Sequence, residues 1–173
     1  MTNEKIELLH VDDSQQLVDA AAELLELEDE SIEVVTATSA DEGLEVLSEN
    51  ESRRGGGGTT GSGTDIDCVV SDYQMPDSDG LEFLEDVREE YPDLPFILFT
   101  GKGSEEIASE AISAGVTDYL QKTGGSDQYT VLANRVQNAV EQRRARTNYR
   151  EIFEKASDAI FIHDPETGVV EDL

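Results

Sequence analysis

Three carboxylates, one hydroxyl and one ammonium group follow apolar runs that lie far apart in this sequence. They are Asp12, Asp13, Asp72, Thr100 and Lys122. Two carboxylates about 4 Å apart repel by roughly 4 kcal/mol at an effective dielectric constant of about 20, so a proton or a cation must offset their charge if they meet. Clustered carboxylate oxygens favour a hard divalent ion. If the fold gathers these residues, their types predict a Mg²⁺ site.

With Mg²⁺ beside them, the same side chains suit phosphoryl transfer. The ion would let Asp72 stay ionised as a nucleophile and would neutralise charge on an incoming phosphoryl group. Lys122 would add a positive charge, and Thr100 would donate its hydroxyl to a phosphoryl oxygen. This reaction depends mostly on positioning and charge stabilisation. Each residue alone also fits a structural role, such as a helix cap or a solvated lysine, so the hypothesis depends on all of them meeting.

Five short apolar runs are predicted to be the buried strands that position these residues. They cover residues 6–11, 32–37, 66–70, 96–99 and 116–120. Apolar residues recur at helical spacing after each run, as in the set Leu17, Ala21, Leu24 and Leu25. Strands that alternate with helices imply a parallel sheet with right-handed crossovers and helices on both faces. We therefore predict an α/β fold, a flavodoxin-like (βα)5 doubly wound parallel sheet with strand order 2-1-3-4-5.

This strand order predicts where the chemistry lies. Ligands of open α/β sheets bind beyond the carboxyl ends of the strands, at the point where the strand order reverses. Here the reversal falls between the strands at 6–11 and 66–70, which are followed by Asp12-Asp13 and by Asp72. Carboxylates from distant parts of the sequence should therefore converge there.

Smaller signals fix the ends of the elements. Ser14 and Ser39 are predicted helix N-caps, and Gly115 stands where a left-handed residue ends a helix. Cys68 and His10 lie inside apolar runs, so we interpret them as strand residues rather than as ligands. Neither is therefore assigned a chemical role.

Residues 50–65 form a low-complexity stretch with four consecutive glycines, Gly55 to Gly58. This composition is typical of a flexible loop. A phosphate-binding loop is the alternative, but no Gly-Lys-Ser or Gly-Lys-Thr follows the glycines. The predicted topology also places this loop at the amino end of a strand, away from the carboxylates.

The composition is strongly acidic, with 40 acidic residues, 12 basic residues and a formal net charge of −28. Such a surface repels phosphates, which excludes nucleic acid as a direct partner. It resembles the proteins of halophilic archaea, in which concentrated salt screens self-repulsion; a merely acidic protein is the alternative. No apolar run approaches the roughly 18–20 residues of a membrane span. The N-terminus lacks a signal-peptide pattern, so we expect a cytoplasmic protein without a membrane segment.

The motifs together resemble the receiver domain of response regulators over about residues 4–145. The resemblance is carried by Asp12-Asp13, by Asp72 followed by Met75-Pro76 and Asp79-Gly80, by Thr100 and by Lys122. It implies two-component phosphorelay signalling, in which Asp72 accepts a phosphoryl group from the phosphohistidine of a histidine kinase. It also implies self-catalysed phosphorylation and slow autodephosphorylation rather than conventional enzyme activity.

The resemblance assigns a role to each site residue. Asp13, Asp72 and the backbone carbonyl of Gln74 would hold Mg²⁺, with Asp12 acting through water. Thr100 and Tyr119 would be the switch pair, and Lys122 would contact the phosphoryl oxygens. The sequence departs from the family at Thr123, because the family usually has a proline after the lysine, often with a cis bond. That departure predicts a looser loop and a less certain position for Lys122.

The last part of the chain, residues 146–173, resembles a linker helix followed by the truncated start of a PAS domain. Ile152, Phe153, Ala156 and Ile160 mark an amphipathic helix, and residues 165–168 are predicted to form a turn. We therefore predict a receiver domain at 1–145, in the N-terminal part of a receiver–PAS protein or of a larger hybrid histidine kinase. The alternative to a PAS start is an amphipathic dimerising tail, and a homodimer through the last helix and the linker is expected.

Three other functions share part of this pattern. A dehalogenase-like phosphatase would need an acid two residues after Asp72, where Gln74 stands. A flavin-binding module of the same fold would need a phosphate-binding loop where Asp12-Asp13 would repel phosphate. A phosphorylation-independent interaction module stays open, because binding alone needs none of the site chemistry.

Overall fold

The structure, a computed structural model, describes residues 4–54, 66–155, 162–163 and 170–171. The chain divides into two compact units, Met1–Arg143 and Arg144–Leu173. Across the described ranges, every helix is too short or too polar to cross a membrane.

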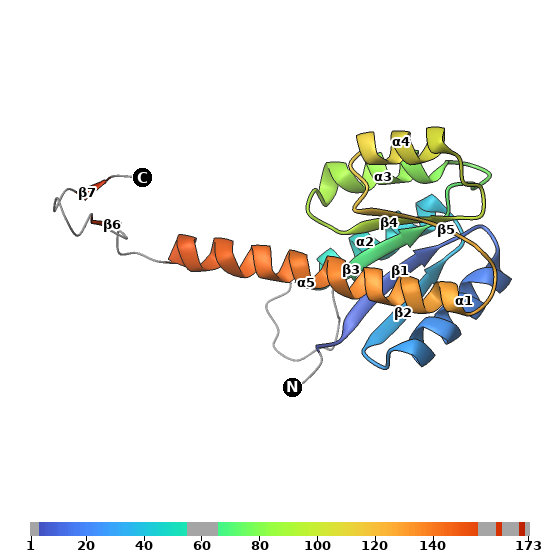
Figure 1. Ribbon diagram of the computed structural model, residues 1–173, viewed down its shortest axis with the longest axis horizontal. Coiled ribbons are helices and arrows are strands. Elements are labelled where there is room, and N and C mark those ends of the chain that lie inside the picture. Colours follow the sequence, from blue (N-terminus) through green and yellow to red (C-terminus); the bar gives the residue numbers. More distant parts are fainter. Residues whose placement is uncertain (1–3, 55–65, 156–161, 164–169, 172–173) are drawn as a thin grey trace. The chain divides into compact units, whose positions relative to one another are not determined.

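The first unit is built on a five-stranded parallel sheet with the order β2-β1-β3-β4-β5 (Figure 1). The strands are β1 (Ile6–Val11), β2 (Ile32–Ala37), β3 (Ile66–Ser71), β4 (Phe96–Thr100) and β5 (Asp118–Gln121). The predicted flavodoxin-like order is confirmed. β5 begins at Asp118 rather than at residue 116, because the Val116 amide donates to the Ala111 carbonyl at the end of the preceding helix.

Five helices accompany the sheet within the described residues. They are α1 (Gln15–Glu28), α2 (Ala40–Arg54), α3 (Gly80–Glu90), α4 (Glu105–Ser113) and α5 (Asp127–Lys155). The predicted caps are confirmed: Ser14 Oγ accepts from the Leu17 amide and Ser39 Oγ accepts from the Glu42 amide. Gly115, just beyond α4, has the predicted left-handed backbone with a φ of 86°.

Helices cover both faces of the sheet (Figure 1), and an apolar core lies on each face. The first contains residues of α2, α3 and α4 packed on the sheet, with Phe83 and Phe96 in edge-to-face contact. The second contains Leu25 of α1 and Leu132 and Val136 of α5. This burial on both faces explains why the strands read as nearly continuous apolar runs.

Two sequence predictions differ from the structure in detail. Leu17 was assigned to the buried stripe of α1, but it is 48% exposed and its neighbour Val18 is buried instead. Ala21 and Leu25 of the predicted set are buried, so the difference is confined to the first turn of α1, where Val18 faces the core in place of Leu17. α2 continues to Arg54, so residues 50–54 of the predicted loop are helical, whereas residues 55–65 lie outside the described residues.

The second unit contains the last part of α5 and a two-stranded antiparallel pair. α5 continues as one helix to Lys155, so Ile152 and Phe153 belong to it rather than to a separate short helix. β6 (Ile162–His163) pairs with β7 (Val170–Glu171). The predicted turn at residues 165–168, together with Ala156 and Ile160, lies outside the described residues, and the PAS start stays a prediction.

Candidate functional site

The residues predicted to do chemistry follow neighbouring strands at one edge of the sheet. Asp12 comes directly after β1, Asp72 after β3 and Lys122 after β5. Backbone hydrogen bonds hold these ends in register: the Asp72 amide donates to the Val11 carbonyl over 2.9 Å, and the Lys122 amide donates to the Thr100 carbonyl over 2.8 Å. Parallel pairing therefore brings together residues that lie up to 110 positions apart in the sequence.

The ammonium group of Lys122 joins the two acidic strand ends. Its Nζ lies 2.6 Å from Asp12 Oδ2 and 3.3 Å from Asp72 Oδ1. Both carboxylates are buried, with 2% of Asp12 and 8% of Asp72 exposed. Burial alone would lower the pKa of Lys122, but its hydrogen bond to Asp12 and the charges of both carboxylates outweigh burial and raise it. The lysine therefore stays charged and offsets part of the repulsion between the acids.

Backbone amides fix the remaining oxygens of the two carboxylates. Asp12 Oδ1 accepts from the Ser14 amide over 3.0 Å, and Asp72 Oδ2 accepts from the Gln74 amide over 3.0 Å. Each carboxylate is thus held at both oxygens, by an amide on one side and by Lys122 on the other. This pattern fixes the carboxylate orientation before any ligand arrives.

Gly80, the first residue of α3, allows the helix to approach Asp72. A Cβ added at Gly80 would lie 2.4 Å from the Asp72 carbonyl oxygen and 3.1 Å from Tyr73 Cα, both of them backbone atoms. The Gly80 amide donates to the Tyr73 carbonyl over 2.8 Å. Asp79 caps the helix and shares a capping box with Glu82. The Asp79-Gly80 pair therefore closes the turn that follows Asp72.

Asp13 differs from the two buried acids because its side chain is exposed. Within the described residues, no group of three or more His, Cys, Asp or Glu side chains is arranged as a metal site. The predicted set of three carboxylates is therefore only partly assembled, because the Lys122 ammonium joins Asp12 and Asp72 while Asp13 is exposed. Three carboxylates and one ammonium group leave a formal charge of −2 (−3 + 1) at these strand ends.

Thr100 ends β4 and Tyr119 lies in the neighbouring strand β5, with no hydrogen bond between their side chains within the described residues. Thr100 is buried, and its Oγ1 accepts from the Lys102 amide over 3.2 Å. The Tyr119 hydroxyl is buried and has no hydrogen-bond partner among the described residues. Gln74 has an exposed side chain and contributes its amide to Asp72. The positions of Thr100, Tyr119 and Gln74 are thus described, and the switch and metal-binding roles predicted for them stay predictions.

Sequence reasoning assigned no site role to His10, Phe99 or Gln128, which lie close to these groups. The Phe99 ring lies 5.5 Å from Lys122 Nζ, within cation–π range. His10 is buried in β1, and neither ring nitrogen has a hydrogen-bond partner in the described structure. Burial lowers the pKa of His10 to about 4, although the nearby Asp12 charge acts in the opposite direction. The alternation of β1 indicates that His10 shares a face with Leu8, but no sequence signal predicts its contacts.

The loop between β5 and α5 is held by Gln128. Gln128 Oε1 accepts from the Thr123 amide over 3.1 Å and from the Gly124 amide over 3.4 Å. No peptide bond in the described residues is cis, and Gly124 and Gly125 have positive φ angles of 78° and 88°. A side chain therefore ties down the backbone after Lys122, and the looser loop predicted from Thr123 stays a prediction.

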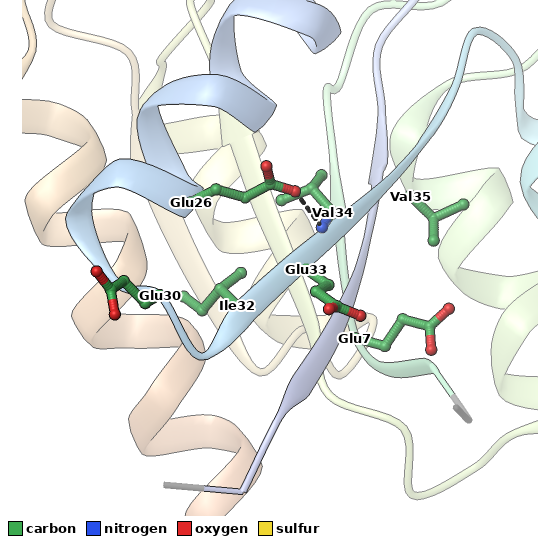
Figure 2. Close-up of a pocket in the computed structure, with 7 residues that line it drawn as sticks. All are labelled: Glu7, Glu26, Glu30, Ile32, Glu33, Val34 and Val35. Carbon is green, nitrogen blue, oxygen red and sulfur yellow. Dashed lines mark hydrogen bonds between the residues drawn. The ribbon is translucent and has the colours of Figure 1, made fainter. Parts of the chain in front are cut away.

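A second group of acidic side chains lines a pocket beside the edge strand β2 (Figure 2). Glu7, Glu26, Glu30 and Glu33 line this pocket together with Ile32, Val34 and Val35. Glu26 reaches from α1 and accepts from the Val34 amide over 3.0 Å. Glu33 pairs with Lys5, and both side chains are more than half exposed. Beside β2, Glu33 thus pairs with an exposed lysine, whereas Asp12 and Asp72 at the strand ends pair with the partly buried Lys122.

Comparisons with known proteins agree with the geometry. The family model described as the response regulator receiver domain matches residues 8–134. The chain is 32% identical over 115 residues to the response regulator SaeR of Staphylococcus aureus, covering 66% of this chain. It is 34% identical over 94 residues to the DNA-binding transcriptional regulator NtrC of Proteus hauseri, covering 54% of this chain. A receiver-domain crystal structure from Clostridium thermocellum aligns with a TM-score of 0.66 at 27% identity, covering 81% of this chain and 98% of that one.

The matches to the two curated relatives cover less than half of the length of each relative. The chain spans 43% of the length of SaeR and 20% of the length of NtrC. The likeness thus concerns the unit that carries Asp12, Asp72 and Lys122.

Proposed function

The chain belongs to the response regulator receiver family, and from that premise we propose that Asp72 accepts a phosphoryl group from the phosphohistidine of a histidine kinase. Receiver domains of this family serve two-component, phosphorylation-based signalling. The observation that carries the proposal is the Lys122 ammonium shared by Asp12 and Asp72 at the strand ends. This lysine is partly buried between two carboxylates from separate strands, whereas most lysines extend into solvent.

The proposed reaction is a transfer from nitrogen to oxygen. An Asp72 carboxylate oxygen forms the new P–O bond while the P–N bond of the donor breaks, and the imidazole nitrogen keeps the electron pair. The Gln74 amide holds Asp72 Oδ2, which favours one orientation of the nucleophile. Lys122 already lies 3.3 Å from Asp72 Oδ1, so its charge is in place to contact the phosphoryl oxygens.

Mg²⁺ is the proposed cofactor. The donors at the strand ends are oxygen atoms with a formal charge of −2 after Lys122 is counted, which suits a hard divalent ion. Asp13, Asp72 and the backbone carbonyl of Gln74 would hold the ion, with Asp12 acting through water. When bound, Mg²⁺ would supply positive charge against the acids and the incoming phosphoryl group.

Thr100 and Tyr119 are the proposed switch. The Thr100 hydroxyl would donate to a phosphoryl oxygen on Asp72, and the Tyr119 ring would turn inward after it moves. The buried Tyr119 hydroxyl without a partner supports this role, because an unsatisfied polar group favours a second arrangement in which it is bonded. The surface of α4, β5 and α5 would change with it.

The test is acetyl phosphate labelling followed by intact-mass measurement and peptide mapping. We expect one phosphoryl group on Asp72 with Mg²⁺ and none with EDTA. Absence of labelling in Mg²⁺, with the protein folded by circular dichroism, would instead favour the phosphorylation-independent interaction module.

Properties of the whole protein are also proposals, because the matched relatives are longer than this chain. We propose a cytoplasmic receiver–PAS signalling protein that forms a homodimer through α5 and the linker. The net charge of −28 supports adaptation to concentrated salt. A melting temperature that rises steeply from dilute buffer to about 1 M KCl, where the Debye length is about 3 Å, would support this adaptation. An unchanged melting temperature would contradict it.

A further inference from the structure

The side chain of Gln128 is hydrogen-bonded to the backbone that follows Lys122. We propose that Gln128 is a positioning residue for this lysine. This inference rests on the proposed function of Asp72. Lys122 needs a fixed backbone, because its Nζ must meet carboxylates that belong to β1 and β3. On its N-terminal side, the Lys122 amide is bonded to the Thr100 carbonyl of β4. On its C-terminal side, the chain leaves the sheet.

Within the described residues, Gln128 is the hydrogen-bond partner found for the first two amides of that departing backbone. Thr123, Gly124 and Gly125 are exposed, and both glycines adopt positive φ angles. A glycine pair loses much conformational entropy when it is ordered, so such a loop needs a tie. Gln128 Oε1 supplies one acceptor for two successive amides, at 3.1 Å and 3.4 Å. The first bond requires a backbone N–H at residue 123, which Thr123 has and a proline would lack.

Gln128 itself stands on a well-anchored turn of α5. Its neighbour Tyr129 packs edge-to-face on Phe99, with ring centroids 6.1 Å apart. Leu132, one turn further along, is fully buried in the core beneath. Phe99 in turn lies 5.5 Å from Lys122 Nζ. The Gln128 side chain therefore connects a rigid part of the core to the peptide that follows Lys122.

The experiment compares Gln128→Ala with Gln128→Glu and with Gln142→Ala, using full-length protein, acetyl phosphate and saturating Mg²⁺. Gln128→Ala loses the acceptor, and we expect labelling of Asp72 to slow about fivefold, the size of one modest hydrogen bond. Gln128→Glu keeps an acceptor oxygen and should retain a rate within about twofold of the original. Gln142, exposed on the same helix, is the matched control and should also stay within about twofold.

Repeating Gln128→Ala in a Lys122→Met background distinguishes a positioning role of Gln128 from a merely structural one. If Gln128 acts through Lys122, adding Gln128→Ala to Lys122→Met slows labelling by less than about twofold, because the positioned group is gone. An equal fivefold loss in both backgrounds would overturn the inference, as would an unchanged rate in Gln128→Ala.

Amide hydrogen exchange checks the contact independently of labelling. Gln128→Ala should speed exchange at Thr123 and Gly124 by about fivefold to tenfold, while the control leaves it unchanged. Unchanged exchange in Gln128→Ala would overturn the inference whatever the labelling rates are. If the unaltered protein is not labelled at Asp72, the proposed function fails and the positioning role falls with it, even where exchange confirms the contact.

Discussion

The carboxylates at the ends of β1 and β3 and those beside the edge strand β2 carry the same charge in very different surroundings. Asp12 and Asp72 are buried and share an ammonium group whose side chain is only 22% exposed. Beside β2, Glu33 forms an ion pair with Lys5, and the side chains of Glu33 and Lys5 are 51% and 63% exposed. Solvent screens the second pair far more than the first.

This difference teaches that burial and a shared cation, rather than the number of acids, mark the chemical site. The β2 pocket has four glutamates, and one of them, Glu26, accepts a hydrogen bond from the Val34 amide and so covers the sheet edge. The strand-end group has fewer acids, and backbone amides hold both buried ones. We therefore expect substitutions at the strand ends to change phosphoryl transfer and matched substitutions beside β2 to leave it unchanged.

The largest effect is expected for Asp72→Asn. The amide keeps the shape of the side chain but removes the nucleophilic carboxylate, so labelling by acetyl phosphate should be lost entirely. Glu33→Gln is the matched change beside β2 and should label at the original rate. Labelling that persists in Asp72→Asn, measured by intact mass, would show that another residue is the acceptor.

The next effect is expected for the two lysines. Lys122→Met should slow labelling about 100-fold, the usual order for removing one group that stabilises developing charge. Lys5→Met should change the rate by less than about twofold, and stability by at most about 1 kcal/mol, because its ion pair is exposed. Equal effects of the two changes on the labelling rate would remove the distinction between the two regions.

The buried His10 next to the strand-end acids should make the free energy of unfolding depend on pH, whereas the exposed glutamates beside β2 should not. Its pKa is about 4 in the folded protein against about 6.5 when unfolded, so the unfolded chain takes up the proton first as pH falls. Its contribution to stability is complete above about pH 6.5 and is lost progressively down to about pH 4. Between pH 7 and pH 5 this loss is about 2 kcal/mol. Urea denaturation should show it in the original protein and in Glu33→Gln, and a flatter dependence in His10→Leu; equal slopes in all three would contradict it.

The smallest effect is expected for Asp13→Asn. Asp13 is the exposed member of the strand-end acids, so its loss should weaken Mg²⁺ affinity about tenfold while the fold stays intact. Glu30→Gln beside β2 is the control and should leave the affinity unchanged. Isothermal titration with Mg²⁺ measures both, and an equal weakening by Glu30→Gln would indicate a general effect of charge.

The sequence predicts the fold and the gathering of the strand-end residues well, because alternation and strand order depend on residue type and spacing. It also places Asp12, Asp72 and Lys122 after the correct strands. It does not predict that Lys122 directly joins the two acids or that Gln128 holds the following loop, because those contacts depend on side-chain rotamers. Leu17 and Val18 are both apolar, so spacing alone does not decide which of them faces the core in the first turn of α1, and it is Val18 that does.

The most direct test of the account is a crystal structure of the protein with Mg²⁺ and beryllium fluoride, a mimic of the phosphoryl group. We predict the beryllium on Asp72, with Mg²⁺ beside it at about 2.1 Å from oxygens of Asp72 and Asp13. Density for the ion among Glu7, Glu26 and Glu33 instead, with nothing bound to Asp72, would contradict the account.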